Sequence, residues 1–173
     1  NAYGSSPHGG VLVVAGDDHG CVSSSMPHQS DVAFMSWFMP TLHPADVGEY
    51  LAFGEYGYAL SRFSGMWVGF KAISETVESS ASIVSDPDRI KIIMPDDFEM
   101  PPGGLNLRWP DDRFDQDRRL QDYKGFAAIA FARANKVNRI TMDSPNARYG
   151  IMASGKSYED IRQALRELGI TPE

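Results

Sequence analysis

Cysteine is almost absent from this chain, which has one, Cys21, among 173 residues. A single thiol cannot close an internal disulfide, and an iron–sulfur cluster takes four ligands that are usually thiolates. The sequence therefore excludes a disulfide framework and a cluster held by this chain alone. It favours a reducing compartment, and we expect the protein to be cytoplasmic.

Basic residues and long apolar runs are also scarce. The 16 Lys and Arg residues are outnumbered by 23 Asp and Glu residues, which gives a net charge of −7. Binding to nucleic acid or to an anionic membrane surface needs clustered cations, and a membrane-spanning helix needs about 20 apolar residues in a row. We therefore expect no nucleic-acid partner and no membrane partner.

The remaining pattern predicts alternating strands and helices. The chain is long enough for one sizeable core, or for a core plus part of another. Short apolar or β-branched runs predict strands, and apolar residues at helical spacing predict helices. Strands joined through helices pair in parallel with right-handed crossovers. We expect an α/β fold with a mainly parallel sheet and flanking helices. The predicted strands are residues 11–15, 41–42, 66–73, 90–94, 140–142 and 149–153, and we expect the first three to be neighbours in the sheet. The predicted helices are residues 26–38, 44–60, 111–134 and 157–168.

Two of these helices carry local signals. Ser157 and Asp160 have the spacing of a capping box at the start of the last helix. The helix before it has an apolar stripe, which should face the core. That stripe consists of Leu120, Tyr123, Ala127, Ala130, Phe131 and Ala134.

A dense polar segment, GDDHGCVSSSMPHQSD at residues 16–31, follows the first predicted strand. In open α/β sheets, ligands bind just beyond the carboxyl ends of the strands. A solvated loop capped by its own serine and aspartate side chains is the alternative interpretation. The candidate binding residues are, in order, Asp17, Asp18, His19, Ser23, Ser24, His28 and Gln29.

The order of this segment, a strand running into GDDHG, a serine run and PHQS, closely resembles the indolepyruvate and related 2-oxoacid ferredoxin oxidoreductases. Residues 39–78 and 140–170, the latter reading ITMDSPNARYGIMASGKSYEDIRQALRELGI, are similar to the same family. The resemblance implies that residues 1–86 are the later half of a pyrimidine-type thiamine-diphosphate domain. It further implies that residues 87–110 are a connecting arm and that residues 111–173 begin a transketolase-C-terminal-like domain. The start at Asn1, without an initiator Met, suggests a piece of a longer protein.

For the intact enzyme, the resemblance implies oxidative decarboxylation of an aryl- or alkyl-2-oxoacid to the acyl-CoA. The implied cofactors are thiamine diphosphate, magnesium and iron–sulfur clusters, and the implied partners are ferredoxin and coenzyme A. This chain would supply a wall of the cofactor cleft, formed by the candidate residues, and interface surface for the remaining domains of the same enzyme. The oligomeric state stays open, a homodimer being one option.

The resemblance also implies what this chain does not supply. No asparagine stands between Asp18 and Asn106, so the magnesium-binding continuation of the family's diphosphate motif is missing. The family's catalytic glutamate comes from a segment upstream of the first strand. We therefore expect no catalytic residue, no metal-binding residue, no tightly bound cofactor and no activity from the chain by itself.

Two function classes remain besides the one that the resemblance implies. Residues 150–157, GIMASGKS, satisfy the Walker A pattern, which would make the chain a P-loop nucleotide-binding protein. The apolar residues 151–153 instead favour a strand within the motif, and its glycine and serine then shape a strand-to-helix turn. A non-catalytic interaction module is the second alternative.

All four histidines and the cysteine lie in the first quarter of the chain. His19, Cys21 and His28 carry atoms that suit zinc, but their spacing matches no structural zinc motif. Hydrogen bonding within the loop is the simpler interpretation of the two histidines. For His43, which stands between a predicted strand and Pro44, we expect a structural role.

Overall fold

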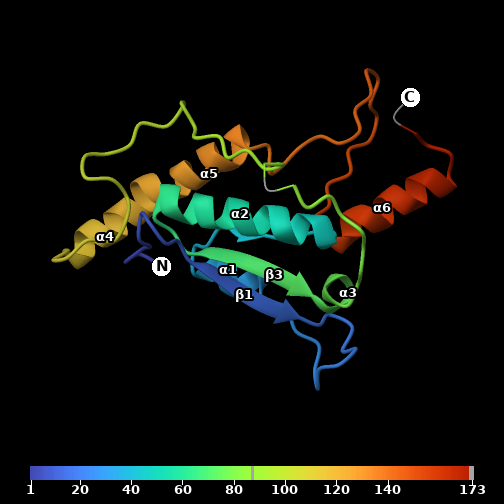
Figure 1. Ribbon diagram of the computed structural model, residues 1–173, viewed down its shortest axis with the longest axis horizontal. Helices are drawn as coiled ribbons and strands as arrows, with labels where there is room; N and C mark the ends of the chain where they lie inside the picture. Colours follow the sequence, from blue (N-terminus) through green and yellow to red (C-terminus); the bar gives the residue numbers. More distant parts are fainter. Residues whose placement is uncertain (87, 172–173) are drawn as a thin grey trace.

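A three-stranded parallel sheet with helices on both faces forms the centre of the molecule (Figure 1). The computed structural model describes residues 1–86 and 88–171. The elements are β1 (Leu12–Asp17), α1 (Asp31–Ser36), β2 (Thr41–Leu42), α2 (Val47–Ser64), β3 (Val68–Ile73), α3 (Ser74–Val77), α4 (Arg113–Arg119), the π-helical turn η1 (Leu120–Lys124), α5 (Gly125–Ala134) and α6 (Lys156–Glu167).

The strand order is β1-β3-β2, and both pairings are parallel. This confirms the prediction that the first three strands are neighbours in a parallel sheet. The central strand β3 is the most deeply buried, with Val68 fully inaccessible and Ile73 4% exposed. Val14 on β1 is 65% exposed, because β1 lies at the edge of the sheet.

Alternation along β3 directs side chains to two different helices. Val68 and Phe70 join the hydrophobic core that includes α2, and Phe70 packs against Tyr50 of that helix. The intervening positions face α1, where a Cβ added at Gly69 would meet the ring of Phe34 at 3.0 Å. Successive strand residues point to opposite faces, so α1 and α2 cover opposite sides of the sheet.

Helix α2 is fixed at both ends by local hydrogen bonds. The Asp46 side chain accepts from the Glu49 amide at 2.8 Å, and the Glu49 carboxylate accepts from the Ala45 amide at 2.9 Å. The helix ends at Gly65, whose φ of +67° suits glycine. In mid-helix, Gly57 lies directly on the sheet, since a Cβ there would come within 2.5 Å of the Leu12 side chain. A glycine at this position lets the backbone of α2 approach β1.

The helix predicted at 111–134 is present, with a π-helical turn in its middle. Asp112 caps its start by accepting from the amides of Phe114 and Asp115. The extra residue of the turn changes the phase of the buried face. Of the predicted stripe, four residues are buried, Ala134 is half-buried and Tyr123 is 37% exposed. Lys124 turns inward in place of Tyr123.

The buried Lys124 ammonium joins two distant segments. It donates to the carbonyls of Ala2 at 3.0 Å and Gly65 at 3.1 Å, so it satisfies the C-terminal end of α2 and holds the start of the chain. Burial, with a smaller contribution from the nearby Arg119 charge, lowers the pKa of Lys124 to about 8.

Three predicted strands and one predicted helix cap are absent from the described structure. Residues 90–94, 140–142 and 149–153 form no strand, because a strand needs a neighbour to receive its backbone hydrogen bonds. Tyr149 is 88% exposed and Met152 is 97% exposed. The capping box at Ser157 is also wrong, since α6 begins at Lys156 with Gly155 as its N-cap and no side-chain cap.

The helix predicted from residue 26 starts only at Asp31. Residues 18–29 form a loop instead, because the Ser30 amide donates to the Asp17 side chain at 2.9 Å and ties the chain back to the end of β1. None of the described helices is long and apolar enough to cross a membrane.

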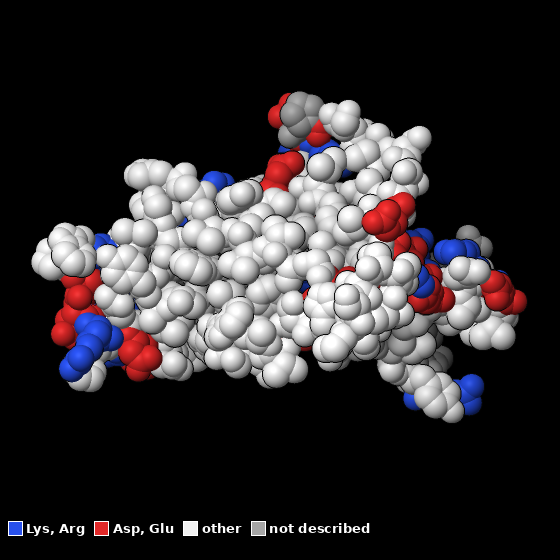
Figure 2. Space-filling view, turned by 90° about the horizontal axis from the view of Figure 1, so that it is seen from below, with Lys and Arg blue, Asp and Glu red and all other residues white. Residues whose placement is uncertain are grey.

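Charged side chains gather at the two ends of the molecule on the face shown in Figure 2. That face lies on the side where β1 is found in Figure 1, and its centre is almost free of Lys, Arg, Asp and Glu. Exposed apolar side chains are frequent on β1 and α1, namely Val14, Val32 and Met35.

Candidate functional site

An ion network lies at the carboxyl end of the sheet, beneath the polar loop. Asp17 is the last residue of β1, and its side chain is inaccessible to solvent. It accepts hydrogen bonds from the Ser30 amide and from the Ser30 hydroxyl at 2.7 Å. Lys71 of β3 places its ammonium 3.4 Å from the Asp17 carboxylate and donates to Asp31 at the start of α1. The network therefore joins β1, β3 and α1.

The network keeps Asp17 ionised although it is buried. Burial alone would raise the pKa of this carboxyl group, but the two Ser30 hydrogen bonds and the Lys71 charge together hold the pKa below its ordinary value. Lys71 is itself only 3% exposed. A buried lysine between two carboxylates is a position where the charges must balance.

Asp18 shapes the serine run instead of facing a ligand. Its carboxylate accepts from three successive backbone amides, those of Val22, Ser23 and Ser24, each at 2.8 Å. These bonds, led by that of Ser23, hold the pKa of Asp18 far below its ordinary value. Three amides aimed at one point resemble an anion-binding nest. Because Asp18 already fills it, these amides are not available to a phosphate group.

Three of the sequence candidates line a small pocket in the loop. His19, Pro27, His28 and Gln29 surround a volume of about 190 Å³. The His28 ring lies 2.9 Å from the Gly16 carbonyl through Nε2, and because a carbonyl only accepts, Nε2 carries the proton. His19 lies above the ion network, with Nε2 3.8 Å from an Asp17 oxygen. The pocket thus presents two imidazoles and an amide above the ion network, whose charges are balanced.

The candidates do not all come together. His19, His28 and Gln29 share the pocket, whereas Asp17 and Asp18 are buried beneath the loop. Ser23 and Ser24 take part through their amides. Lys71 is not among the sequence candidates, although it stands as a charge inside an otherwise apolar predicted strand.

Among the described residues, one group of side chains has the spacing of a metal site, formed by Asp17, His19 and Asp31. Its ligand atoms lie within 4.8 Å of one another, but the Lys71 ammonium contacts both carboxylates. The positive charge that a metal ion would bring is therefore already supplied. The trio of His19, Cys21 and His28 is not assembled, and the Cys21 thiol donates to the Ser24 carbonyl at 3.4 Å.

The Walker-like segment does not have the geometry of a phosphate loop. A P-loop connects a strand to a helix and leaves its lysine free for phosphates. Residues 149–153 form no strand, and Lys156 pairs with Asp160 at 2.6 Å. The structure therefore gives no support to nucleotide binding at residues 150–157.

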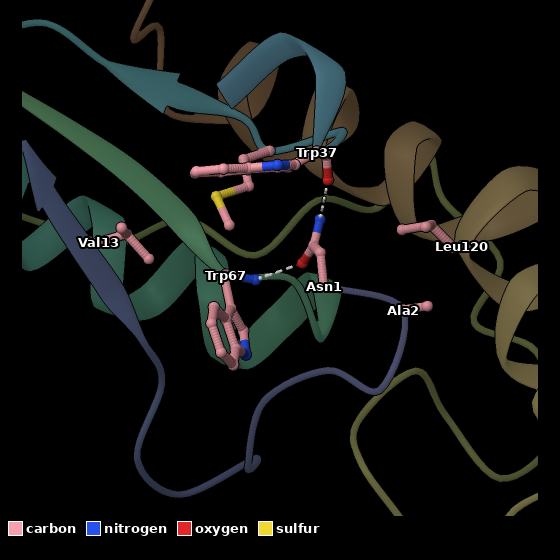
Figure 3. A pocket seen from close by; sticks show the side chains of 7 residues that line it. Asn1, Ala2, Val13, Trp37, Trp67 and Leu120 are labelled. Atoms are coloured by element: carbon pink, nitrogen blue, oxygen red, sulfur yellow. Dashed lines mark hydrogen bonds between the residues drawn. The ribbon is translucent and has the colours of Figure 1, made fainter. Parts of the chain in front are cut away.

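A second, larger pocket lies away from this polar site (Figure 3). It has a volume of about 450 Å³ and is mainly apolar. The Asn1 side chain links its two tryptophans, donating to the Trp37 carbonyl at 3.2 Å and accepting from the Trp67 amide at 2.9 Å. Trp67 precedes β3, whereas the ion network lies at the carboxyl end of the sheet, so the two features are separate.

Comparison with known proteins gives one match. No curated protein and no solved structure matches the chain. Residues 138–173 match the family model described as the indolepyruvate ferredoxin oxidoreductase middle domain. This match covers α6 and the irregular segment before it, and it includes residues 140–170, the last of the regions for which the sequence indicates that family. The likeness to the indolepyruvate ferredoxin oxidoreductases is thus confirmed for residues 138–173.

Proposed function

We infer that this chain is part of a larger 2-oxoacid:ferredoxin oxidoreductase and that its loop pocket forms one wall of the cofactor cleft. The observation that carries the proposal is the pocket of His19, His28 and Gln29 at the carboxyl end of a parallel sheet. The middle-domain match of residues 138–173 supports the enzyme class. The reaction that we propose is the oxidative decarboxylation of a 2-oxoacid to an acyl-CoA.

The size of the pocket favours a wall over a complete site. Ligand pockets usually have volumes of about 300–1,000 Å³, so about 190 Å³ encloses only part of a cofactor or substrate. The remaining surface would come from other domains of the same enzyme. Under this proposal, they are the principal partners of the chain.

The donor set fits an uncharged heteroaromatic ring or a carboxylate better than a magnesium diphosphate. Asp17 and Asp31 are balanced by Lys71, and Asp18 is occupied by loop amides, which leaves none of these carboxylates free for magnesium. His19, His28 and Gln29 are the residues that would contact thiamine diphosphate. When bound, this cofactor supplies the electron sink for decarboxylation.

In this proposal, the residues of this chain hold the bound group and fix its orientation. His28 keeps a fixed ring orientation through Gly16, so its other nitrogen, Nδ1, is the acceptor. Gln29 offers both a donor and an acceptor. The Asp17–Lys71–Asp31 network fixes the loop that carries them.

The test uses the oxidoreductase that carries this chain, with His19→Ala and His28→Ala measured separately. We expect each variant to weaken thiamine-diphosphate affinity or to lower kcat/KM for the 2-oxoacid by at least about tenfold, a loss of about 1.4 kcal/mol in binding or in transition-state stabilisation. His8→Ala, an exposed histidine outside the loop pocket, is the matched control and should have no effect. Changes below about twofold in both histidine variants would reduce the pocket to ordinary surface.

A further inference from the structure

The contact between His43 and the N-terminal turn of α6 is unusual for a structural histidine. His43 directly follows β2 and so lies at the carboxyl end of the sheet, as Asp17 does. Its Nδ1 lies 3.3 Å from the Ser154 hydroxyl. Its Nε2 is buried and has no hydrogen-bond partner within the described residues. Leaving a buried polar atom unpaired costs free energy, so the closed contact is not optimised for stability.

Gly155 is what closes this contact. It is the N-cap of α6 and is buried, with φ +58° and ψ −146°, a backbone conformation that is essentially restricted to glycine. A Cβ built at Gly155 would overlap three atoms of the His43 ring, Nε2 among them. The backbone of the turn therefore lies directly against the imidazole nitrogen.

The surroundings of the His43 imidazole favour its neutral form. Burial, followed by the positive charge of Lys71, lowers the pKa of His43. The carboxylates of Asp17 and Asp31 act in the opposite direction, and His19 adds to the lowering. His43 therefore stands within the electrostatic reach of the ion network that supports the loop pocket.

Helix α6 is weakly held, which lets the contact open locally. None of its residues is buried, and its apolar residues Ile161 and Leu165 are only half-buried. Figure 1 shows α6 at the end of the sheet to which the strands point, beside the start of α2. Elements with few buried contacts open at a lower free energy than the core.

We propose that the Ser154–Gly155 turn is a lid that covers His43 and that opening of α6 adds this imidazole to the polar site at the sheet edge. Through this lid, the segment that matches the middle-domain family would control access to the edge of the sheet. The role of the lid in turnover rests on the proposed function, whereas its opening is a property of this chain and can be tested alone.

The experiment measures the accessibility of each histidine with diethyl pyrocarbonate, which acylates neutral imidazole nitrogens, followed by peptide mass spectrometry. In the wild type, His43 should react at least about tenfold more slowly than the exposed His8, because its Nε2 is covered. Gly155→Ala should raise the His43 rate by about fivefold or more. Gly150→Ala is the matched control on the same segment, since no atom lies within 4 Å of its added Cβ, and it should leave the rate unchanged.

A second measurement covers the case in which Gly155→Ala unfolds the whole chain. In the wild type, the His43 reaction and the hydrogen exchange of the hydrogen-bonded α6 amides, from Asp160 onward, should share a small urea dependence, below that of core amides such as Phe131. If His43 reacts as fast as His8, or opens only with the core, the lid is refuted and the proposed function stands. If His19→Ala and His28→Ala instead leave cofactor affinity and turnover unchanged, the proposed function is refuted and the lid is not affected.

Discussion

Replacing Lys71 with Met tests whether the ion network holds the loop. The substitution keeps most of the length of the side chain, but it leaves Asp17 buried without its cation. Removing one partner of a fully buried ion pair costs about 3–5 kcal/mol. Here the cost should be about 2–4 kcal/mol, because the Asp31 side chain is 46% exposed and Asp17 keeps both Ser30 hydrogen bonds.

Urea denaturation followed by circular dichroism measures this loss. With a slope of about 2 kcal/mol per molar urea, the unfolding midpoint should fall by about 1–2 M. Lys91→Met, at an exposed lysine, is the matched control and should change stability by less than about 0.5 kcal/mol. A midpoint within 0.3 M of the wild type, on the order of 0.6 kcal/mol at that slope, would refute the view that Lys71 balances the network.

The pH dependence gives an independent check. In the wild type the pKa of Asp17 lies below 3.8, so its contribution to stability is complete above that pH and is lost as pH falls through the folded pKa. Without Lys71, the pKa of Asp17 rises, because burial is then opposed only by the Ser30 hydrogen bonds. The stability difference between the two proteins should therefore shrink as the pH falls below about 4, and a difference that stays constant from neutral pH downward would contradict this reasoning.

Three further predictions concern close packing, the Walker-like segment and the buried lysine of the π-helical turn. Gly57→Ala should destabilise by about 1–3 kcal/mol in urea, because its Cβ would meet Leu12 at 2.5 Å. Gly54→Ala on the same helix, where nothing lies within 4 Å, should stabilise by up to about 1 kcal/mol, and equal effects would show that α2 does not press on the sheet. Calorimetry with ATP and magnesium should give no binding heat in the wild type, and a heat that Lys156→Ala abolishes would restore the P-loop interpretation. The lowered pKa of Lys124, about 8 against 10.5, means that the unfolded chain binds more protons in this window. Wild-type stability relative to Lys124→Met should therefore rise from pH 8 to 10.5 in urea titrations, and a fall would show that Lys124 is not desolvated.

The first half of the fold could be predicted because its signals are local. Residues 11–15, 41–42 and 66–73 are short apolar runs separated by helical segments, and strands joined through helices lie parallel in one sheet. Residues 140–142 and 149–153 have similar runs but form no strand, since pairing depends on a partner and not on the run itself. The π-helical turn at Leu120–Lys124 is likewise absent from the pattern, because one extra residue in a turn changes the buried face without changing the composition.

The position of the candidate residues at the sheet edge could be predicted, but not the contacts that they make. The position of Asp17 after a strand indicated the sheet edge correctly. Nothing local indicates that Lys71, 54 residues further along the chain, balances the Asp17 charge, because charge pairs between distant segments leave no periodic signal. The contact of His43 with Gly155 could not be predicted for a similar reason, since it joins segments far apart in the chain.

The two adjacent aspartates explain why the candidate site favours an uncharged or anionic ligand group. Strand geometry sends Asp17 and the following Asp18 in opposite directions. One carboxylate is consequently paired with Lys71 and the other with the amides of the serine run. With both negative charges neutralised inside the protein, the loop presents mainly imidazole and amide groups, led by His28 and Gln29, to whatever binds. Asp18→Asn should therefore act through the loop: losing the carboxylate weakens three amide hydrogen bonds, so exchange of the Val22–Ser24 amides should accelerate by at least about tenfold while core amides stay protected. Unchanged exchange at these three amides would mean that Asp18 does not organise the serine run and that its carboxylate is free for a ligand.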